Sequence, residues 1–178
     1  SIGYNDLLAV IVARCLTELP YMNVQLGADG LRQMPDVSLG LAVDSPRGLL
    51  VPVVHGADRL GVREFAVRFR ELVARAREGK SLPDELTGGT FTITNLGMFG
   101  IDMFTPIINL PECAILGVGR IVPKQVVIDA EAERVAIRHM LFLSLTFDHR
   151  LVDGAPAARF LQRVKQYVEK PYLWLVRQ

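Results

Sequence analysis

The sequence lacks strong net charge and long hydrophobic runs. It has 178 residues, with 20 Lys and Arg against 19 Asp and Glu, so the formal net charge is +1. This balance offers no electrostatic reason to expect nucleic acid or an anionic membrane as a partner. No apolar run reaches the roughly 20 residues that a membrane-spanning helix needs, and the first residues lack a signal-peptide layout. We therefore expect no nucleic-acid partner and no membrane partner.

Cysteine is also scarce. Cys15 and Cys113 lie in the apolar stretches RCLTEL and PECAILGV, which predicts buried free thiols in a reducing compartment. Neither forms a metal-type spacing with the three histidines, so we expect no metal. Half of the residues are hydrophobic and 22% are charged, an ordinary globular balance that suffices for one domain with a sizeable core.

Hydrophobic periodicity predicts helices and hairpins in alternation. Helices are expected at 5–19, with Asn5 as its cap, at 62–78, with Gly79 at its end, and at 156–169. Strands are expected at 23–26, 37–43, 49–54, 90–94, 112–119, 126–128, 135–140 and 141–147. The stretch 95–97, directly after the strand at 90–94, is expected to form a tight turn in which Gly97 is free to adopt a positive φ. The pattern predicts one α/β domain, a two-layer sandwich with a mixed β-sheet and packed helices.

The stretch 141–154, LFLSLTFDHRLVDG, joins an alternating strand to a helix through a loop with titratable side chains. His149 lies between Asp148 and Arg150, with Asp153 four positions on. Histidine has an unperturbed pKa near neutrality and can take and return a proton within one catalytic cycle. Asp153 could orient the loop, or it could cap the following helix. The alternative to a catalytic loop is a salt-bridged structural one.

A second candidate is the stretch 88–100, GGTFTITNLGMFG, whose threonine hydroxyls and asparagine amide lie beside a glycine-rich turn. Hydroxyl donors at such a place could stabilise an oxyanion. The alternative is a β-branched strand with solvent-facing threonines. The glycine spacings match neither a dinucleotide-binding fingerprint nor a P-loop.

Taken together, these stretches resemble the catalytic domain of the dihydrolipoamide acyltransferases, the core component of 2-oxo acid dehydrogenase complexes. DHRLVDG at 148–154 fits that family's DHRxxDG signature, and 88–100 resembles its oxyanion-side loop. DVSLGLAVDSPRGLLVPVV at 36–54 resembles its hairpin, and TPIINLPECAILGVG at 105–119 also fits. The motifs occur in the family's order over essentially all of 1–178. The resemblance implies a chloramphenicol-acetyltransferase-like fold.

The resemblance also implies the chemistry. It makes His149 the general base, Thr94 the donor to a tetrahedral oxyanion and Asp153 the acidic member of the motif, with support from Arg150 and Asn95. The implied reaction moves an acyl group between dihydrolipoamide and coenzyme A, without a metal. A free thiol has a pKa of about 8.5 and is mostly protonated at neutral pH, hence the base. The loop at 98–108 has no obvious basic residue for a succinyl carboxylate, which favours an acetyl or branched-chain acyl group.

The implied assembly is a homotrimer that builds a cubic or icosahedral core, with His149 and Thr94 from neighbouring subunits. Its implied partners are lipoyl domains, a decarboxylase and dihydrolipoamide dehydrogenase, in the bacterial cytoplasm or the mitochondrial matrix. The family's domain has several tens of residues before the point where this chain begins, and we expect its lipoyl and peripheral-subunit-binding domains to lie outside 1–178. The apolar stretch 172–176 is expected to pack on a neighbouring element or subunit.

Two other functions stay open. The chain could be a non-catalytic scaffold of such a core. It could also be a small-molecule acetyltransferase, which is disfavoured because related chloramphenicol acetyltransferases carry a histidine at the position of Asp148.

Overall fold

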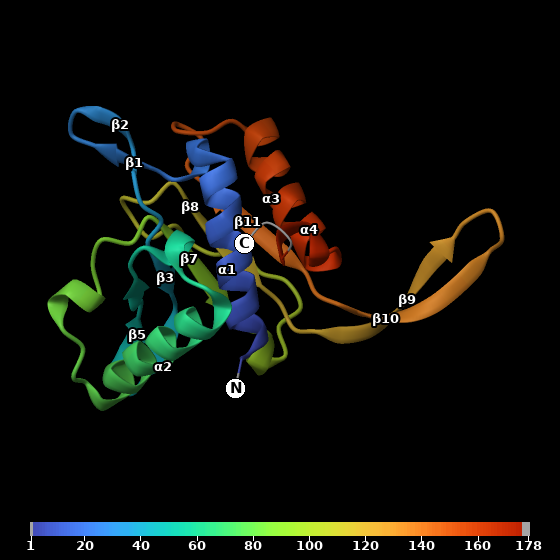
Figure 1. Cartoon of the computed structure of the whole chain (residues 1–178), viewed down its shortest axis with the longest axis horizontal. Helices are drawn as coiled ribbons and strands as arrows, with labels where there is room; N and C mark the ends of the chain where they lie inside the picture. The colour runs from blue at the N-terminus through green and yellow to red at the C-terminus, as the bar shows by residue number, and fades with distance from the viewer. Residues whose placement is uncertain (1, 176–178) are drawn as a thin grey trace.

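The computed structural model describes residues 2–175 (Figure 1). The α-helices are α1 Tyr4–Glu18, α2 Val62–Glu78, α3 Gly154–Glu169 and α4 Tyr172–Leu175. The strands are β1 Val24–Gly27, β2 Gly30–Gln33, β3 Leu39–Leu41, β4 Val43–Ser45, β5 Gly48–Leu50, β6 Val53–Val54, β7 Phe91–Asn95, β8 Ala114–Val118, β9 Val122–Asp129, β10 Arg134–Met140 and β11 Leu143–Phe147. Most expected elements are present with shifted ends, and β2 was not expected.

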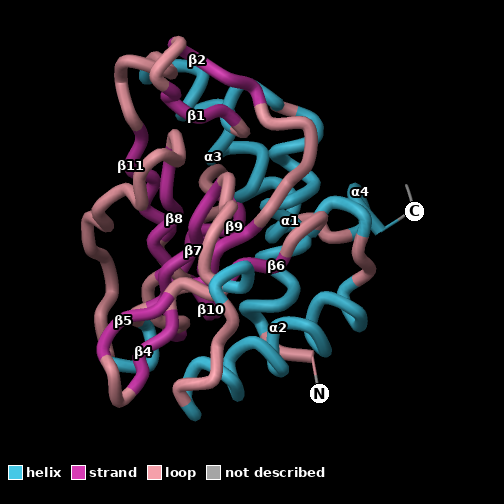
Figure 2. Tube along the Cα trace, turned by 90° about the vertical axis from the view of Figure 1, so that its left-hand side faces the viewer, coloured by secondary structure: helices cyan, strands magenta, loops and turns pink. Residues whose placement is uncertain are grey.

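The main sheet has five strands in the order β11-β8-β7-β3-β6. Strands β3, β7 and β8 run parallel, whereas β11 and β6 are antiparallel to their neighbours, so the sheet is mixed. Helices and strands form separate layers (Figure 2). Strand β8 is buried at every position, as expected for the continuous apolar run of a central strand. The predicted two-layer α/β class is confirmed.

Helix α1 is central to the helical layer. It contacts both α2 and α3, and it buries nearly every residue between Leu8 and Leu16. Helix α2 lies at the outside and buries only one stripe, which includes Phe65, Leu72 and Ala76, as a surface helix does. The predicted end of α2 is confirmed, because Gly79 follows it in the left-handed region with φ 69°.

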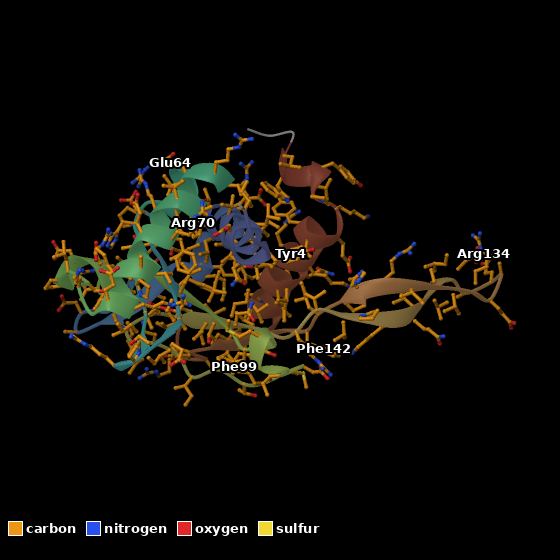
Figure 3. All side chains as sticks on the ribbon, turned by 90° about the horizontal axis from the view of Figure 1, so that it is seen from below. Tyr4, Glu64, Arg70, Phe99, Arg134 and Phe142 are labelled. Carbon is orange, nitrogen blue, oxygen red and sulfur yellow. The ribbon has the colours of Figure 1, made fainter. Side chains whose placement is uncertain are left out.

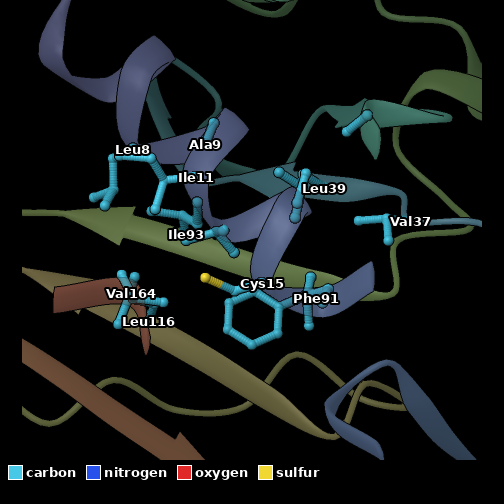
Figure 4. Close-up of a cluster of buried hydrophobic side chains, with 14 of the residues drawn as sticks. Leu8, Ala9, Ile11, Cys15, Val37, Leu39, Phe91, Ile93, Leu116 and Val164 are labelled. Atoms are coloured by element: carbon cyan, nitrogen blue, oxygen red, sulfur yellow. The ribbon is translucent and has the colours of Figure 1, made fainter. Parts of the chain in front are cut away.

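The core lies between this helical layer and the sheet (Figure 4). Phe91 of β7 and Phe160 of α3 are fully buried, with ring centroids 5.5 Å apart. Both cysteines are free and buried, as predicted. Burial raises the pKa of Cys15 to about 12 and that of Cys113 to about 11. These thiols therefore act as small apolar side chains.

Strands β9 and β10 form a two-stranded sheet of their own within the described residues, and this arm projects from the domain (Figures 1 and 3). Arg134 lies toward its tip in Figure 3. The predicted hairpin at 37–54 is present but divided. Strands β3 and β6, farther from the turn, pair within the main sheet. Strands β4 and β5, next to the turn, form a separate two-stranded ribbon.

Three details differ from the expectations. Helix α1 is not capped by Asn5: it begins at Tyr4, and the Asp6 carboxylate accepts a hydrogen bond of 2.8 Å from the Gly3 N–H. Gly97 does not adopt a positive φ. A Cβ there would lie 2.8 Å from Arg120 Cα, so close backbone approach is what requires glycine. Helix α3 begins two residues before the predicted start.

The apolar stretch 172–176 forms the short helix α4 over Tyr172–Leu175. Trp174 is buried in the core cluster, so packing on a neighbouring element is confirmed for this residue. Val176 lies outside the described residues. Within residues 2–175, no helix is both long and apolar enough to cross a membrane.

Candidate active site

His149 lies on the loop between β11 and α3, and its side chain is 70% exposed. Its Nδ1 atom is 3.7 Å from Oδ1 of Asp153, whose side chain is 85% exposed. That distance exceeds a hydrogen bond, so the two residues are neighbours without a direct bond. The Phe147 ring, 5.6 Å away between centroids, packs beside the imidazole. One chain therefore presents His149 to solvent, accessible to a substrate.

Asp148 holds the loop to the sheet. Its backbone N–H donates to the Cys113 carbonyl at 2.8 Å and continues the β8–β11 ladder by one bond. Its side chain is 11% exposed and accepts hydrogen bonds from Arg150 Nη2 at 2.6 Å and Nε at 3.0 Å. These bonds with Arg150 lower the pKa of Asp148. Asp148 and Arg150 thus flank His149 in the sequence and pair with each other, and this pair holds the loop on which His149 lies.

Asp153 occupies the N-cap position of α3 with an extended backbone, but its side chain makes no capping hydrogen bond. The expected side-chain cap is therefore absent. Its carbonyl accepts the first helical bond, from Ala157 N at 3.1 Å. The Asp153 carboxylate therefore lies beside His149 without a direct hydrogen bond to it.

Thr94 and Asn95 lie at the carboxyl end of β7. Thr94 is half-buried. The Asn95 side chain is used locally: its Oδ1 accepts from Gly97 N at 2.8 Å, and its Nδ2 donates to Asn5 Oδ1 at 2.7 Å. Asn95 thus supports the turn after β7 and joins it to the start of α1, a contact that the sequence did not suggest.

The sheet register separates Thr94 from His149. Thr94 is paired with Gly117 of β8, and Gly117 is paired with Ser144 of β11. His149 lies five residues beyond Ser144, or about 16 Å along the strand at about 3.3 Å per residue, and two strand spacings of about 4.8 Å away across the sheet. One chain therefore cannot bring both side chains to one reacting atom.

A cavity of about 550 Å³ lies near the Thr94 end of the sheet. Tyr4, Arg70, Asn95 and Arg120 are among the residues that line it, from the start of α1, from α2 and from the loops after β7 and β8. Neither Thr94 nor His149 lines it. Sequence reasoning missed Arg120, which reaches the loop at 98–108 and pairs with Asp102 there at 2.5 Å. Among residues 2–175, no group of three or more His, Cys, Asp and Glu side chains could hold a metal ion.

The mixed sheet and its helical layer have the architecture of the chloramphenicol-acetyltransferase-like α/β fold. A solved chloramphenicol acetyltransferase matches 93% of this chain and 77% of its own with a TM-score of 0.58 and 15% identity, which supports the fold alone. The family model for 2-oxoacid dehydrogenases acyltransferase (catalytic domain) matches residues 1–176. The chain belongs to this family.

Curated relatives and solved structures agree with this family assignment. The acetyltransferase component of the pyruvate dehydrogenase complex of Mycoplasma capricolum is 44% identical over 91% of this chain and 37% of its own length. The succinyltransferase component of the 2-oxoglutarate dehydrogenase complex of Bartonella vinsonii is 39% identical over 96% of this chain and 41% of its own. The chain thus spans about two fifths of the length of these relatives.

Two solved structures match at a TM-score of 0.93 and 38% identity. One is the cubic core of a pyruvate dehydrogenase multienzyme complex, with 98% of this chain and 72% of that one covered. The other is the dihydrolipoamide acetyltransferase of Azotobacter vinelandii, with 98% and 71% covered, in which a serine, a histidine and an asparagine were studied for catalytic roles.

Proposed function

We propose that the chain transfers an acyl group between dihydrolipoamide and coenzyme A by thioester exchange, within the core of a 2-oxo acid dehydrogenase complex. Membership of the acyltransferase family supports the reaction class. The exposed His149 on a loop held by the Asp148–Arg150 pair supports a base at this position. Asp153, facing the imidazole without bonding to it, orients or stabilises the protonated ring in this proposal.

In the proposed chemistry, His149 removes the proton from the attacking thiol. The thiolate forms a bond to the thioester carbonyl carbon, and Thr94 donates a hydrogen bond to the oxygen as it becomes negative. The tetrahedral species collapses, the carbon–sulfur bond to the original thiol breaks, and His149 returns the proton to the departing thiolate. The reaction balances without a redox partner.

The separation of Thr94 from His149 carries the proposal further. Because one chain holds them at opposite ends of the sheet, we propose that the site forms between copies, with His149 from one and Thr94 from its neighbour. A closed homotrimer repeats one such heterologous contact three times and so provides every copy with both groups. The similarity to a cubic core supports further assembly of these trimers.

Mixing two inactive variants tests the shared site. His149→Ala keeps a working Thr94, and Thr94→Val keeps a working His149. If trimers are reassembled from equal amounts of the two, about a quarter of the contacts between neighbours combine both working residues. We therefore expect about a quarter of the wild-type rate of transfer from acetyl-CoA to dihydrolipoamide, whereas each variant alone falls by about a hundredfold or more.

The outcomes separate the alternatives. A mixture no more active than its components refutes the shared site. His149→Ala at the wild-type rate, with assembly intact by native mass, refutes the catalytic proposal and leaves the scaffold function. Acetylation of an alcohol without use of dihydrolipoamide identifies a small-molecule acetyltransferase instead.

For the acyl group, we propose acetyl or branched-chain acyl. Arg120 lies near the loop at 98–108, and its pairing with Asp102 compensates its charge. A panel of acetyl-, isobutyryl-, isovaleryl- and succinyl-CoA tests this preference, and a higher kcat/KM for succinyl-CoA contradicts it. The proposed partners are lipoyl domains, a decarboxylase and dihydrolipoamide dehydrogenase. The compartment, cytoplasm or mitochondrial matrix, stays a prediction.

A further inference from the structure

Glu112 is a buried titratable residue that the proposed chemistry does not use. It lies two residues before β8 and is 2% exposed. Within residues 2–175, burial and two hydrogen bonds influence its pKa, and no charged side chain is among these influences. Burying a carboxyl group without a cation is costly, so a native protein that keeps one needs a reason for it.

The Glu112 carboxyl joins three segments of the chain. Thr92 Oγ1 of β7 donates to its Oε2 at 2.6 Å, and Asn109 Nδ2 donates to its Oε1 at 3.2 Å. The backbone at Gly89 passes so close that a Cβ there would lie 2.6 Å from Oε1. The carboxyl is thus hydrogen-bonded to β7 and to the turn that leads into β8, and it packs against the backbone just before β7.

This link lies next to the bond that holds the His149 loop. The residue after Glu112 is Cys113, whose carbonyl accepts the hydrogen bond from the Asp148 N–H at 2.8 Å. Ala114 then pairs with Phe147 at the end of β11. If the start of β8 shifts, the acceptor for Asp148 shifts with it, and His149 is the next residue along the chain.

We propose that Glu112 is a positioning residue for His149, acting through the Cys113 carbonyl that anchors Asp148. The Thr92 hydroxyl belongs to the same arrangement, because its hydrogen bond to Oε2 holds the Glu112 carboxyl in place. The inference rests on the proposed function, since the placement of His149 matters to the rate only if His149 is the base.

Variants on both sides of the bond test this role in the assembled protein. Thr92→Val and Glu112→Leu remove the donor and the acceptors at nearly constant volume, whereas Thr92→Ser and Glu112→Gln retain hydrogen-bonding groups. We measure kcat and KM for transfer from acetyl-CoA to dihydrolipoamide. Because a misplaced base slows chemistry from a distance, we expect Thr92→Val and Glu112→Leu to lose about tenfold or more in kcat. KM should stay within about twofold, and Thr92→Ser and Glu112→Gln should recover most of kcat.

Hydrogen–deuterium exchange gives a readout that does not depend on activity. In Thr92→Val and Glu112→Leu, the peptide that contains Asp148 should exchange faster than in the wild type, since its amide loses a fixed acceptor. Thr90→Val is the matched control, because Thr90 is also buried on this segment and its hydroxyl bonds to the Ser38 backbone instead of Glu112. This control should leave the exchange of that peptide and kcat per folded protein unchanged.

The two proposals fail in distinguishable ways. Wild-type kcat and exchange in both Thr92→Val and Glu112→Leu overturn the positioning role, and so does an equal loss in Thr90→Val. If the wild type transfers no acyl group, the proposed function fails and the positioning of His149 for it falls as well. If kcat falls but exchange at Asp148 does not, the path through Cys113 is wrong.

Discussion

Replacing Glu112 with Gln should make the protein more stable at alkaline pH. Burial raises the pKa of this carboxyl to about 7 from an ordinary value of 4.5, against hydrogen bonds from Thr92 and Asn109 that lower it. Between about pH 4.5 and 7, the folded state therefore holds a proton that the unfolded state has released, and the unfolding free energy falls as the pH rises. The stabilisation from this proton is fully present below pH 4.5 and is lost as the pH rises through about 7.

The size of the effect follows from the same values. A difference of about 2.5 pKa units, at about 1.36 kcal/mol each, corresponds to about 3 kcal/mol of unfolding free energy. Glu112→Gln is neutral at every pH and avoids this loss. The quantity to compare is the unfolding free energy of Glu112→Gln minus that of the wild type. We expect this difference to be larger at pH 8 than at pH 4.5, by up to about 3 kcal/mol.

Urea unfolding from pH 4.5 to 8.5 at one fixed protomer concentration measures this difference. Glu131→Gln is the matched control, because it removes an exposed carboxylate from the turn of the β9–β10 arm. It should leave the pH dependence unchanged. Parallel pH profiles for Glu112→Gln and the wild type would refute the reasoning, since they would mean that Glu112 has the same proton affinity in the folded and unfolded states.

Two other predictions concern the buried cysteines and the close backbone approach at Gly97. Cys15 and Cys113 should resist a thiol reagent at pH 8 in the native protein and both react after unfolding, because burial raises their pKa values to about 12 and about 11; rapid native labelling of either would contradict this. Gly97→Ala should lower the unfolding free energy by about 1–3 kcal/mol, because its Cβ would meet the Arg120 backbone at 2.8 Å. Gly154→Ala, with open space around it at the first position of α3 and no positive φ, should not lower the unfolding free energy in the same measurement.

Elements whose signals are local in the sequence were predicted well. The stripe of α2 and its terminal glycine predicted Val62–Glu78 without a shift, since both signals depend on residues within a few positions of each other. The β9–β10 hairpin was also expected, but its separation from the main sheet was not. Strand pairing joins distant residues, and hydrophobic alternation does not say which strand lies beside which.

Local signals failed where a distant group supplied the partner. The constraint on Gly97 comes from Arg120, more than twenty positions along the chain. The polar role of Glu112 was also missed, because ECAILGVG reads as a buried strand and the Thr92 donor comes from another strand. A buried acid is tolerated only if its hydrogen-bonding partners are present, and those are visible only in the folded chain.

The sequence by itself determined the α/β class, the buried cysteines and the two stretches that carry His149 and Thr94. These depend on residue types and on spacings of a few positions, which local chemistry dictates. Only the tertiary structure decided that Thr94 and His149 lie at opposite ends of one sheet, and that Glu112 lies behind the anchor of Asp148. Both follow from strand order and register, which are set by packing across the whole domain.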